Sequence, residues 1–138
     1  MKIKDDFYYM NLALIEAKKS YDIDEVPVGC IIVKDNKVIA KAHNIREKTN
    51  DVFSHAEVLA IKKACKKLNS WKLDDATLYV TLFPCHECAK LIIQSGIKEI
   101  VYMSDKYNGT ESDMASKKML AAAGVKTRMI DEVSLEIK

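Results

Sequence analysis

The order of helical and extended patterns limits most strongly how this chain can fold. Apolar residues recur at helical spacing within residues 6–19, and two short runs rich in strand formers follow at 28–34 and 38–44. The remaining segments alternate: helical patterns begin near residues 55 and 84 and cover 111–122, and strand patterns cover 76–82, 99–103 and 125–130. This order predicts an α/β domain with helices on both faces of one sheet.

The connections between these segments indicate how the strands pair. Asp35-Asn36-Lys37 separates the first two strands, and a turn this short predicts an antiparallel hairpin. The connection from residue 103 to residue 125 contains a helix, and a crossover of that length joins parallel neighbours. We therefore predict three α/β/α layers around a five-stranded mixed sheet whose last two strands are parallel. A chain of 138 residues suits a single domain, residues 1–138.

Two predicted helix starts carry residue types that bind metals. "FSHAEVLAIKKAC" contains His55 and Glu57, and "PCHEC" contains Cys85 and Cys88. Ser54 and Glu57 have the spacing of a capping box, so we expect a helix to begin near His55. Each residue also has an ordinary structural interpretation, as a locally hydrogen-bonded histidine, a capping glutamate and two small buried cysteines.

Together, His55, Cys85 and Cys88 favour a zinc site. Zinc accepts one imidazole and two thiolates in tetrahedral geometry, and a helix N-terminus favours thiolate over thiol. Structural zinc sites use four protein ligands, whereas catalytic sites use three and leave one position for water. His86 is the alternative fourth ligand, but adjacent helical residues diverge by about 100°, so Cys85 and His86 do not share a direction. We predict three ligands and an open position. Glu57, two residues from a ligand, has two interpretations: it caps the helix, or it lies beside the water and moves its proton.

The pattern His-x-Glu followed by Pro-Cys-x-x-Cys resembles the cytidine/deoxycytidylate deaminase superfamily, and the resemblance extends over nearly the whole chain. From "EVPVGCIIVKDNKVIAKAHNIRE" through "SHAEVLAIKKACKKLNSWKLDDATLYVTL" the chain looks like bacterial tRNA adenosine deaminases and somewhat like guanine deaminases. From "FPCHECAKLIIQSGIKEIVYMSDKY" to "AAGVKTRMI" it is similar to deoxycytidylate deaminases. The resemblance implies a cytidine deaminase-like fold and a hydrolytic deaminase that uses Zn²⁺ and no organic cofactor.

The same resemblance implies roles for individual residues. His55, Cys85 and Cys88 correspond to the zinc ligands and Glu57 to the proton shuttle. Two further positions match substrate contacts of the superfamily: Asn44, where an asparagine contacts the sugar or base, and Ala56, whose backbone amide binds the pyrimidine carbonyl.

Two features favour a pyrimidine substrate. Phe83 occupies the position at which adenosine and guanine deaminases of the superfamily usually have glutamate, as in many deoxycytidylate enzymes. "MSDKY" resembles the loop that lies over a pyrimidine nucleotide in that group, so Asp105, Lys106 and Tyr107 are candidate contacts. Lys106 is the candidate for a phosphate contact, and an ordinary solvated loop is the alternative. We predict conversion of deoxycytidine monophosphate to deoxyuridine monophosphate and ammonia.

Three alternatives stay open. The tRNA-like first half is compatible with a tRNA-specific adenosine deaminase, although "TRMIDEVSLEIK" balances its charges and lacks the clustered Lys and Arg that bind a polyanion. A nucleoside or base deaminase, acting on cytidine or guanine, is the second alternative. A non-catalytic zinc-binding module is the third, and it predicts that Glu57 is dispensable.

Composition suggests where the protein acts. The net charge is +2, no apolar run approaches the roughly 20 residues of a membrane span, and the first ten residues lack the apolar stretch of a signal peptide. We therefore expect a cytoplasmic protein without a membrane partner. We also predict a homo-oligomer, a dimer or higher. In the deoxycytidylate group that the chain resembles, members regulated by nucleoside triphosphates often carry a glycine-rich segment and an insertion after the second strand. The corresponding segment here, "HNIREKTNDVFS", is short and contains no glycine, so the resemblance implies no allosteric control by nucleoside triphosphates.

Overall fold

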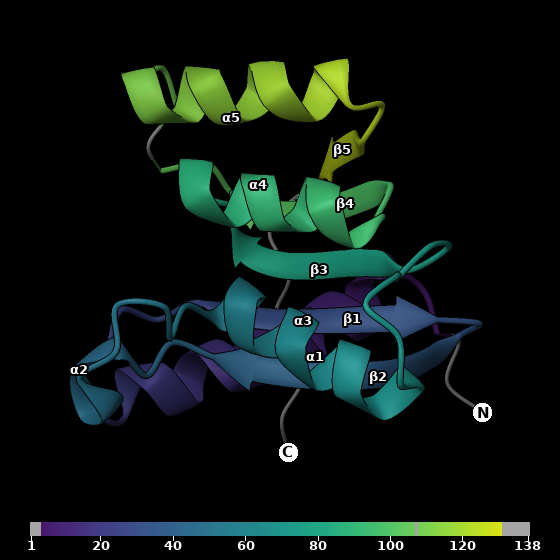
Figure 1. Cartoon of the computed structure of the whole chain (residues 1–138). Helices are drawn as coiled ribbons and strands as arrows, with labels where there is room; N and C mark the ends of the chain where they lie inside the picture. Colours follow the sequence, from purple (N-terminus) through teal and green to yellow (C-terminus); the bar gives the residue numbers. More distant parts are fainter. Residues whose placement is uncertain (1–3, 107, 131–138) are drawn as a thin grey trace.

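The computed structural model describes residues 4–106 and 108–130 (Figure 1). An initial helix is followed by two consecutive strands and two consecutive helices, after which strands and helices alternate. In chain order they are α1 (Asp6–Tyr21), β1 (Gly29–Lys34), β2 (Lys37–His43), α2 (Arg46–Thr49), α3 (Ala56–Leu68), β3 (Thr77–Leu82), α4 (His86–Ser95), β4 (Glu99–Ser104), α5 (Glu111–Ala122) and β5 (Lys126–Met129). None of the helices in the described part of the chain is both long enough and apolar enough to cross a membrane.

The five strands form one mixed sheet in the order β2-β1-β3-β4-β5. β1 is antiparallel to both β2 and β3, whereas β3, β4 and β5 run parallel. Asp35 and Asn36 both have positive φ, at 52° and 60°, as the tight turn of a two-residue hairpin requires. The predicted hairpin, the mixed sheet and the parallel pairing of the last two strands are confirmed.

Each face of the sheet buries its own apolar cluster. Successive side chains of a strand point to opposite faces, so Ile31 and Val33 pack with α1 while Cys30 and Ile32 pack with the cluster beneath α3 and α4. β1 is therefore apolar along nearly its whole length, as expected for a strand covered on both sides. Figure 1 shows α1 on one face of the sheet and α3 and α4 on the other. The predicted three-layer architecture is confirmed.

The start of α3 differs from the sequence-based prediction. His55, not Ser54, is the N-cap residue, and the capping box between Ser54 and Glu57 does not form. The Ser54 hydroxyl instead accepts a hydrogen bond from the Thr49 hydroxyl at 3.0 Å. The Ala56 N–H at the helix start donates to Asn44 Oδ1 at 2.7 Å. A side chain twelve positions earlier thus satisfies the helix end, and no local pattern could indicate this.

Gly29 is where α1 approaches the sheet most closely. A Cβ atom at this position would overlap the Ala13 carbonyl oxygen and lie 2.6 Å from the Ala17 backbone nitrogen, so α1 would have to move away from β1. We expect Gly29→Ala to lower the free energy of unfolding by about 3 kcal/mol, as overpacking of a rigid interior does. Chemical denaturation measures this, with Gly124→Ala as the control.

Gly124 has no atom within 4 Å of a Cβ but has φ of +76°, so alanine there should cost only about 1 kcal/mol. Equal losses of stability in the two variants would contradict the close contact between α1 and β1.

Candidate active site and metal centre

Three potential ligands meet where α3 and α4 begin. His55 is the N-cap of α3, Cys85 is the N-cap of α4, and Cys88 lies in the first turn of α4. The His55 side chain makes no capping hydrogen bond at the start of α3, so it is available for another partner. One nitrogen of His55 and the two sulfur atoms all lie within 4.8 Å of one another.

This donor set fits a zinc ion. Zinc–nitrogen and zinc–sulfur bonds of about 2.0–2.3 Å place tetrahedral ligands roughly 3.5–3.8 Å apart, a spacing that the cluster permits. His86 does not join the cluster formed by the described residues, and its Nδ1 lies 3.6 Å from Glu87 Oε1. Three protein donors match a zinc ion with one open coordination position.

The thiols of Cys85 and Cys88 have pKa values shifted in opposite directions. The Cys88 thiol donates to Cys85, and this hydrogen bond lowers the pKa of Cys85 to about 5 despite its partial burial. Backbone N–H groups of Glu87 and Cys88 at the helix start and the nearby His55 act in the same direction. The same hydrogen bond, together with burial, raises the pKa of Cys88. These contacts favour the thiolate form of Cys85, and a bound cation would displace the proton of Cys88.

Glu57 lies beside this cluster, in the first turn of α3. Its side chain belongs to a residue that is only 4% exposed, and burial raises the pKa of its carboxyl to about 7. A carboxyl group with a pKa near the working pH can both accept and return a proton, which is what a general acid–base catalyst requires.

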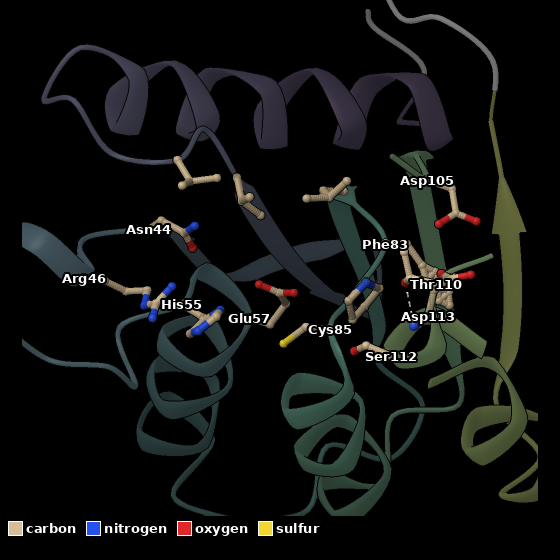
Figure 2. Close-up of a pocket in the computed structure, with 14 residues that line it drawn as sticks. Asn44, Arg46, His55, Glu57, Phe83, Cys85, Asp105, Thr110, Ser112 and Asp113 are labelled. Carbon is tan, nitrogen blue, oxygen red and sulfur yellow. Dashed lines mark hydrogen bonds between the residues drawn. The ribbon is translucent and has the colours of Figure 1, made fainter. Parts of the chain in front are cut away.

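A pocket of about 340 Å³ opens over these residues. This volume is at the lower end of the range for small-molecule sites and suits one nucleoside unit. Figure 2 shows His55, Glu57 and Cys85 in the middle of the pocket wall, with Asn44 and Arg46 on one side. The other side consists of residues that follow β3 and β4, namely Phe83, Asp105, Thr110, Ser112 and Asp113.

Three of the six predicted substrate contacts line this pocket: Asn44, Phe83 and Asp105. Ala56 is fully buried, and its N–H already donates to Asn44 Oδ1, so its predicted role in binding a carbonyl stays a prediction. Lys106 does not line the pocket but a separate hollow, formed with residues of α1 and the end of β4. Tyr107 lies outside the described residues.

Lys117 contacts Phe83 and the two aspartates on this side of the pocket. The Phe83 ring is 6% exposed and packs edge-on against Tyr102, with ring centroids 4.8 Å apart. Lys117 Nζ lies 5.4 Å from the Phe83 ring centroid and forms ion pairs with Asp105 at 2.6 Å and with Asp113 at 2.9 Å. Burial alone would raise the pKa of Asp113, but Lys117 and the Gly109 N–H hold it below its ordinary value.

Sequence reasoning missed five polar or charged residues in or beside this pocket: Arg46, Thr110, Ser112, Asp113 and Lys117. Only Thr110 had a local signal, because it precedes a helical pattern and its hydroxyl caps α5 by accepting from the Asp113 N–H at 3.2 Å. The other four residues reach the site because α2 and α5 pack beside it, and the sequence pattern does not indicate this packing.

Comparisons with known proteins show the family to which the chain belongs. The model of the MafB19-like deaminase family matches residues 4–133. The tRNA-specific adenosine deaminase of Aquifex aeolicus is 46% identical over 103 residues, which are 74% of this chain and 68% of that protein.

Two solved structures are similar over nearly the whole chain. One comes from a study of A-to-I editing by tRNA:A34 deaminases; it has 34% identity and a TM-score of 0.79, and the match covers 93% of this chain and 94% of that one. The other, the dCMP deaminase of the cyanophage S-TIM5, has 26% identity and a TM-score of 0.72, with 94% and 100% covered. The resemblance to the cytidine/deoxycytidylate deaminase superfamily is confirmed. The chain belongs to the MafB19-like deaminase family and is a hydrolytic deaminase.

Proposed function

We propose that this deaminase is zinc-dependent and converts adenosine to inosine in tRNA. The main support for this substrate is the 46% identity to the tRNA-specific adenosine deaminase of Aquifex aeolicus. The similarity to the structure from the tRNA:A34 deaminase study, at a TM-score of 0.79, supports it. The comparisons thus favour the tRNA alternative over the deoxycytidine monophosphate substrate that the sequence motifs suggested first.

His55, Cys85 and Cys88 would hold the zinc ion. A zinc ion held by these residues would supply a positive charge and would lower the pKa of water toward neutrality. Glu57 takes a proton from the attacking water and delivers it to the ring nitrogen. It then takes the proton of the hydroxyl group newly bonded to the ring carbon and passes it to the amino group, which leaves as ammonia while the carbonyl forms. Its burial suits this task, because a carboxyl with a pKa of about 7 holds and releases protons with little driving force either way.

The rest of the pocket orients the base. Asn44 is held by the Ala56 N–H through its Oδ1, so its side chain presents the NH₂ group as a donor in a fixed place. Phe83 offers an apolar surface against which a ring can lie, and its own position is set by Tyr102 and Lys117. Fixed contacts of this kind reduce the entropy lost when the reacting ring is brought to the catalytic groups.

A free pyrimidine nucleotide, deoxycytidine monophosphate, is the second candidate substrate. The specific observation in its favour is Phe83, which lines the pocket at the position where purine deaminases of the superfamily usually carry glutamate. Phenylalanine offers no charge and no hydrogen bond to the edge of a purine. The similarity to the cyanophage dCMP deaminase also supports this candidate.

The predicted homo-oligomer stays a prediction.

One experiment separates the two substrates. Purified enzyme is given a tRNA anticodon stem-loop with adenosine at the wobble position, deoxycytidine monophosphate, cytidine or guanine under identical conditions. We expect inosine to form in the stem-loop with a kcat/KM about a hundredfold above that for any free compound, a ratio typical of a pocket that selects by shape. Mass spectrometry of the digested RNA and chromatography of the nucleotides measure the products. Turnover of deoxycytidine monophosphate without inosine formation would transfer the assignment to the second candidate.

A further inference from the structure

The pocket is charged oppositely on its two sides. Of the fourteen described residues that line it, Arg46 is the only lysine or arginine. Asp105 and Asp113 lie on the other side, where Figure 2 shows them across the pocket from Arg46. We propose that, in the nucleotide or polynucleotide deaminase proposed above, Arg46 binds the phosphate group attached to the nucleoside that is deaminated.

The Arg46 guanidinium is available for such a ligand. Arg46 is exposed, and the part of the chain that the structure describes provides it with no side-chain hydrogen bond or ion pair. A guanidinium presents five N–H donors in a planar fork that matches the oxygen atoms of a phosphate. Since none of the described residues occupies these donors, an incoming phosphate would not have to break an ion pair that this part of the chain provides.

The backbone that carries Arg46 is held firmly although α2 is only one turn long. The buried carboxylate of Glu25 accepts hydrogen bonds from the Glu47 N–H at 3.1 Å and from the Lys48 N–H at 2.8 Å. Thr49 ties the end of the turn to the segment before His55 through the Ser54 hydroxyl at 3.0 Å. Arg46 thus starts from a fixed position between Asn44 and His55, at the side of the pocket.

The opposite wall disfavours an anion. Asp105 and Asp113 contribute two negative charges, and Lys117 offsets only one of them. Lys117 Nζ is already engaged by both carboxylates and by Asn108 Oδ1 at 3.0 Å, so it has little capacity for a phosphate. A substrate that carries a phosphate therefore has lower electrostatic energy with that group beside Arg46 than beside this wall.

Lys106, the phosphate contact suggested by the sequence, is less well placed. It lines the separate hollow with Lys18 and Tyr21 of α1, and it has an interaction of its own within the protein. If Arg46 binds the phosphate, replacing Arg46 weakens phosphate binding; if Lys106 binds it, replacing Lys106 does. The same assay distinguishes the two.

The test compares Arg46→Gln, Lys106→Gln and the control Lys48→Gln with the unchanged protein. Lys48 is exposed on the same turn as Arg46 but does not line the pocket, so its replacement removes an equal charge without the proposed contact. Each protein is assayed with paired substrates that differ in phosphate: deoxycytidine monophosphate against deoxycytidine, and the anticodon stem-loop against adenosine. The first pair reports on a phosphate monoester and the second on the phosphodiesters of RNA.

We expect Arg46→Gln to raise KM for the phosphate-bearing member of the preferred pair about ten- to a hundredfold, as loss of a charge-assisted contact does. The kcat value and the kinetics of the matching nucleoside should change by less than about twofold, and Arg46→Lys should recover part of the loss. Lys48→Gln should behave like the unchanged protein. If RNA supplies the phosphate, the slope of log affinity against log salt should also fall by about one.

Binding of the products provides a second measurement that does not depend on turnover. Deoxyuridine monophosphate and deoxyuridine, or the inosine stem-loop and inosine, are titrated against the same four proteins. If no substrate is turned over, the proposed function fails, and these affinities still test Arg46. Equal weakening of the phosphate-bearing and phosphate-free compounds by Arg46→Gln, no weakening of either, or a selective loss in Lys106→Gln in its place would overturn the role of Arg46.

Discussion

Replacing Glu57 with glutamine should yield a folded, zinc-loaded protein that no longer turns over substrate. Glutamine has nearly the shape of glutamate, and Glu57 is buried in the first turn of α3, so the substitution removes the titratable group without opening a cavity. A general acid–base group typically contributes on the order of a hundred- to ten-thousandfold in rate. Because Glu57 would move two protons in each turnover, we expect a loss at the upper end of this range.

Single-turnover assays with the preferred substrate measure the effect, and thermal melting and metal analysis check the fold and the zinc. Glu87→Gln is the matched control, because Glu87 lies in the first turn of the neighbouring helix α4 but its side chain is 77% exposed. More than about a tenth of the normal activity in Glu57→Gln would exclude the proton-shuttle role. Full activity in that variant is what a non-catalytic role of Glu57 predicts.

Removing one sulfur ligand should have an effect of similar size through the metal. In Cys88→Ala the cluster keeps one imidazole and one thiolate, too few to hold a zinc ion firmly against exchange with water. Without zinc the pKa of the attacking water returns from about 7 toward roughly 15.7, so we expect activity to fall at least about a thousandfold. Elemental analysis should find about one zinc per chain in the unchanged protein and little in the variant.

Cys65→Ala is the control for this experiment. Cys65 lies on α3, is only partly buried and is not part of the His55, Cys85 and Cys88 cluster. Its replacement should leave both the zinc content and the activity intact. If Cys88→Ala retains a full zinc complement, or if the unchanged protein purified without chelator contains none, the proposed metal centre is wrong.

Much of the fold was predictable because its causes are local. The apolar run of β1, the alternating pattern of β3 and the Asp35-Asn36 turn each act over a few residues, and the structure has a strand or a turn at each place. The long helical connection between β4 and β5 predicted that these two strands are parallel, and they are parallel in the sheet. The meeting of His55 with Cys85 and Cys88 was predictable for a chemical reason, since one metal ion can require residues thirty positions apart to come together.

The surroundings of these residues depended on contacts that no local pattern contains. Asn44, not Ser54, satisfies the start of α3, because the end of β2 passes beside it in the folded chain. Lys106 is adjacent in sequence to Asp105, which lines the pocket, yet it lines a separate hollow. Arg46 and Asp113 reach the pocket from opposite sides through the packing of α2 and α5. Local propensities act within a few residues. Which side chains of a loop face a pocket depends instead on the elements, distant in sequence, that pack against the opposite side of that loop.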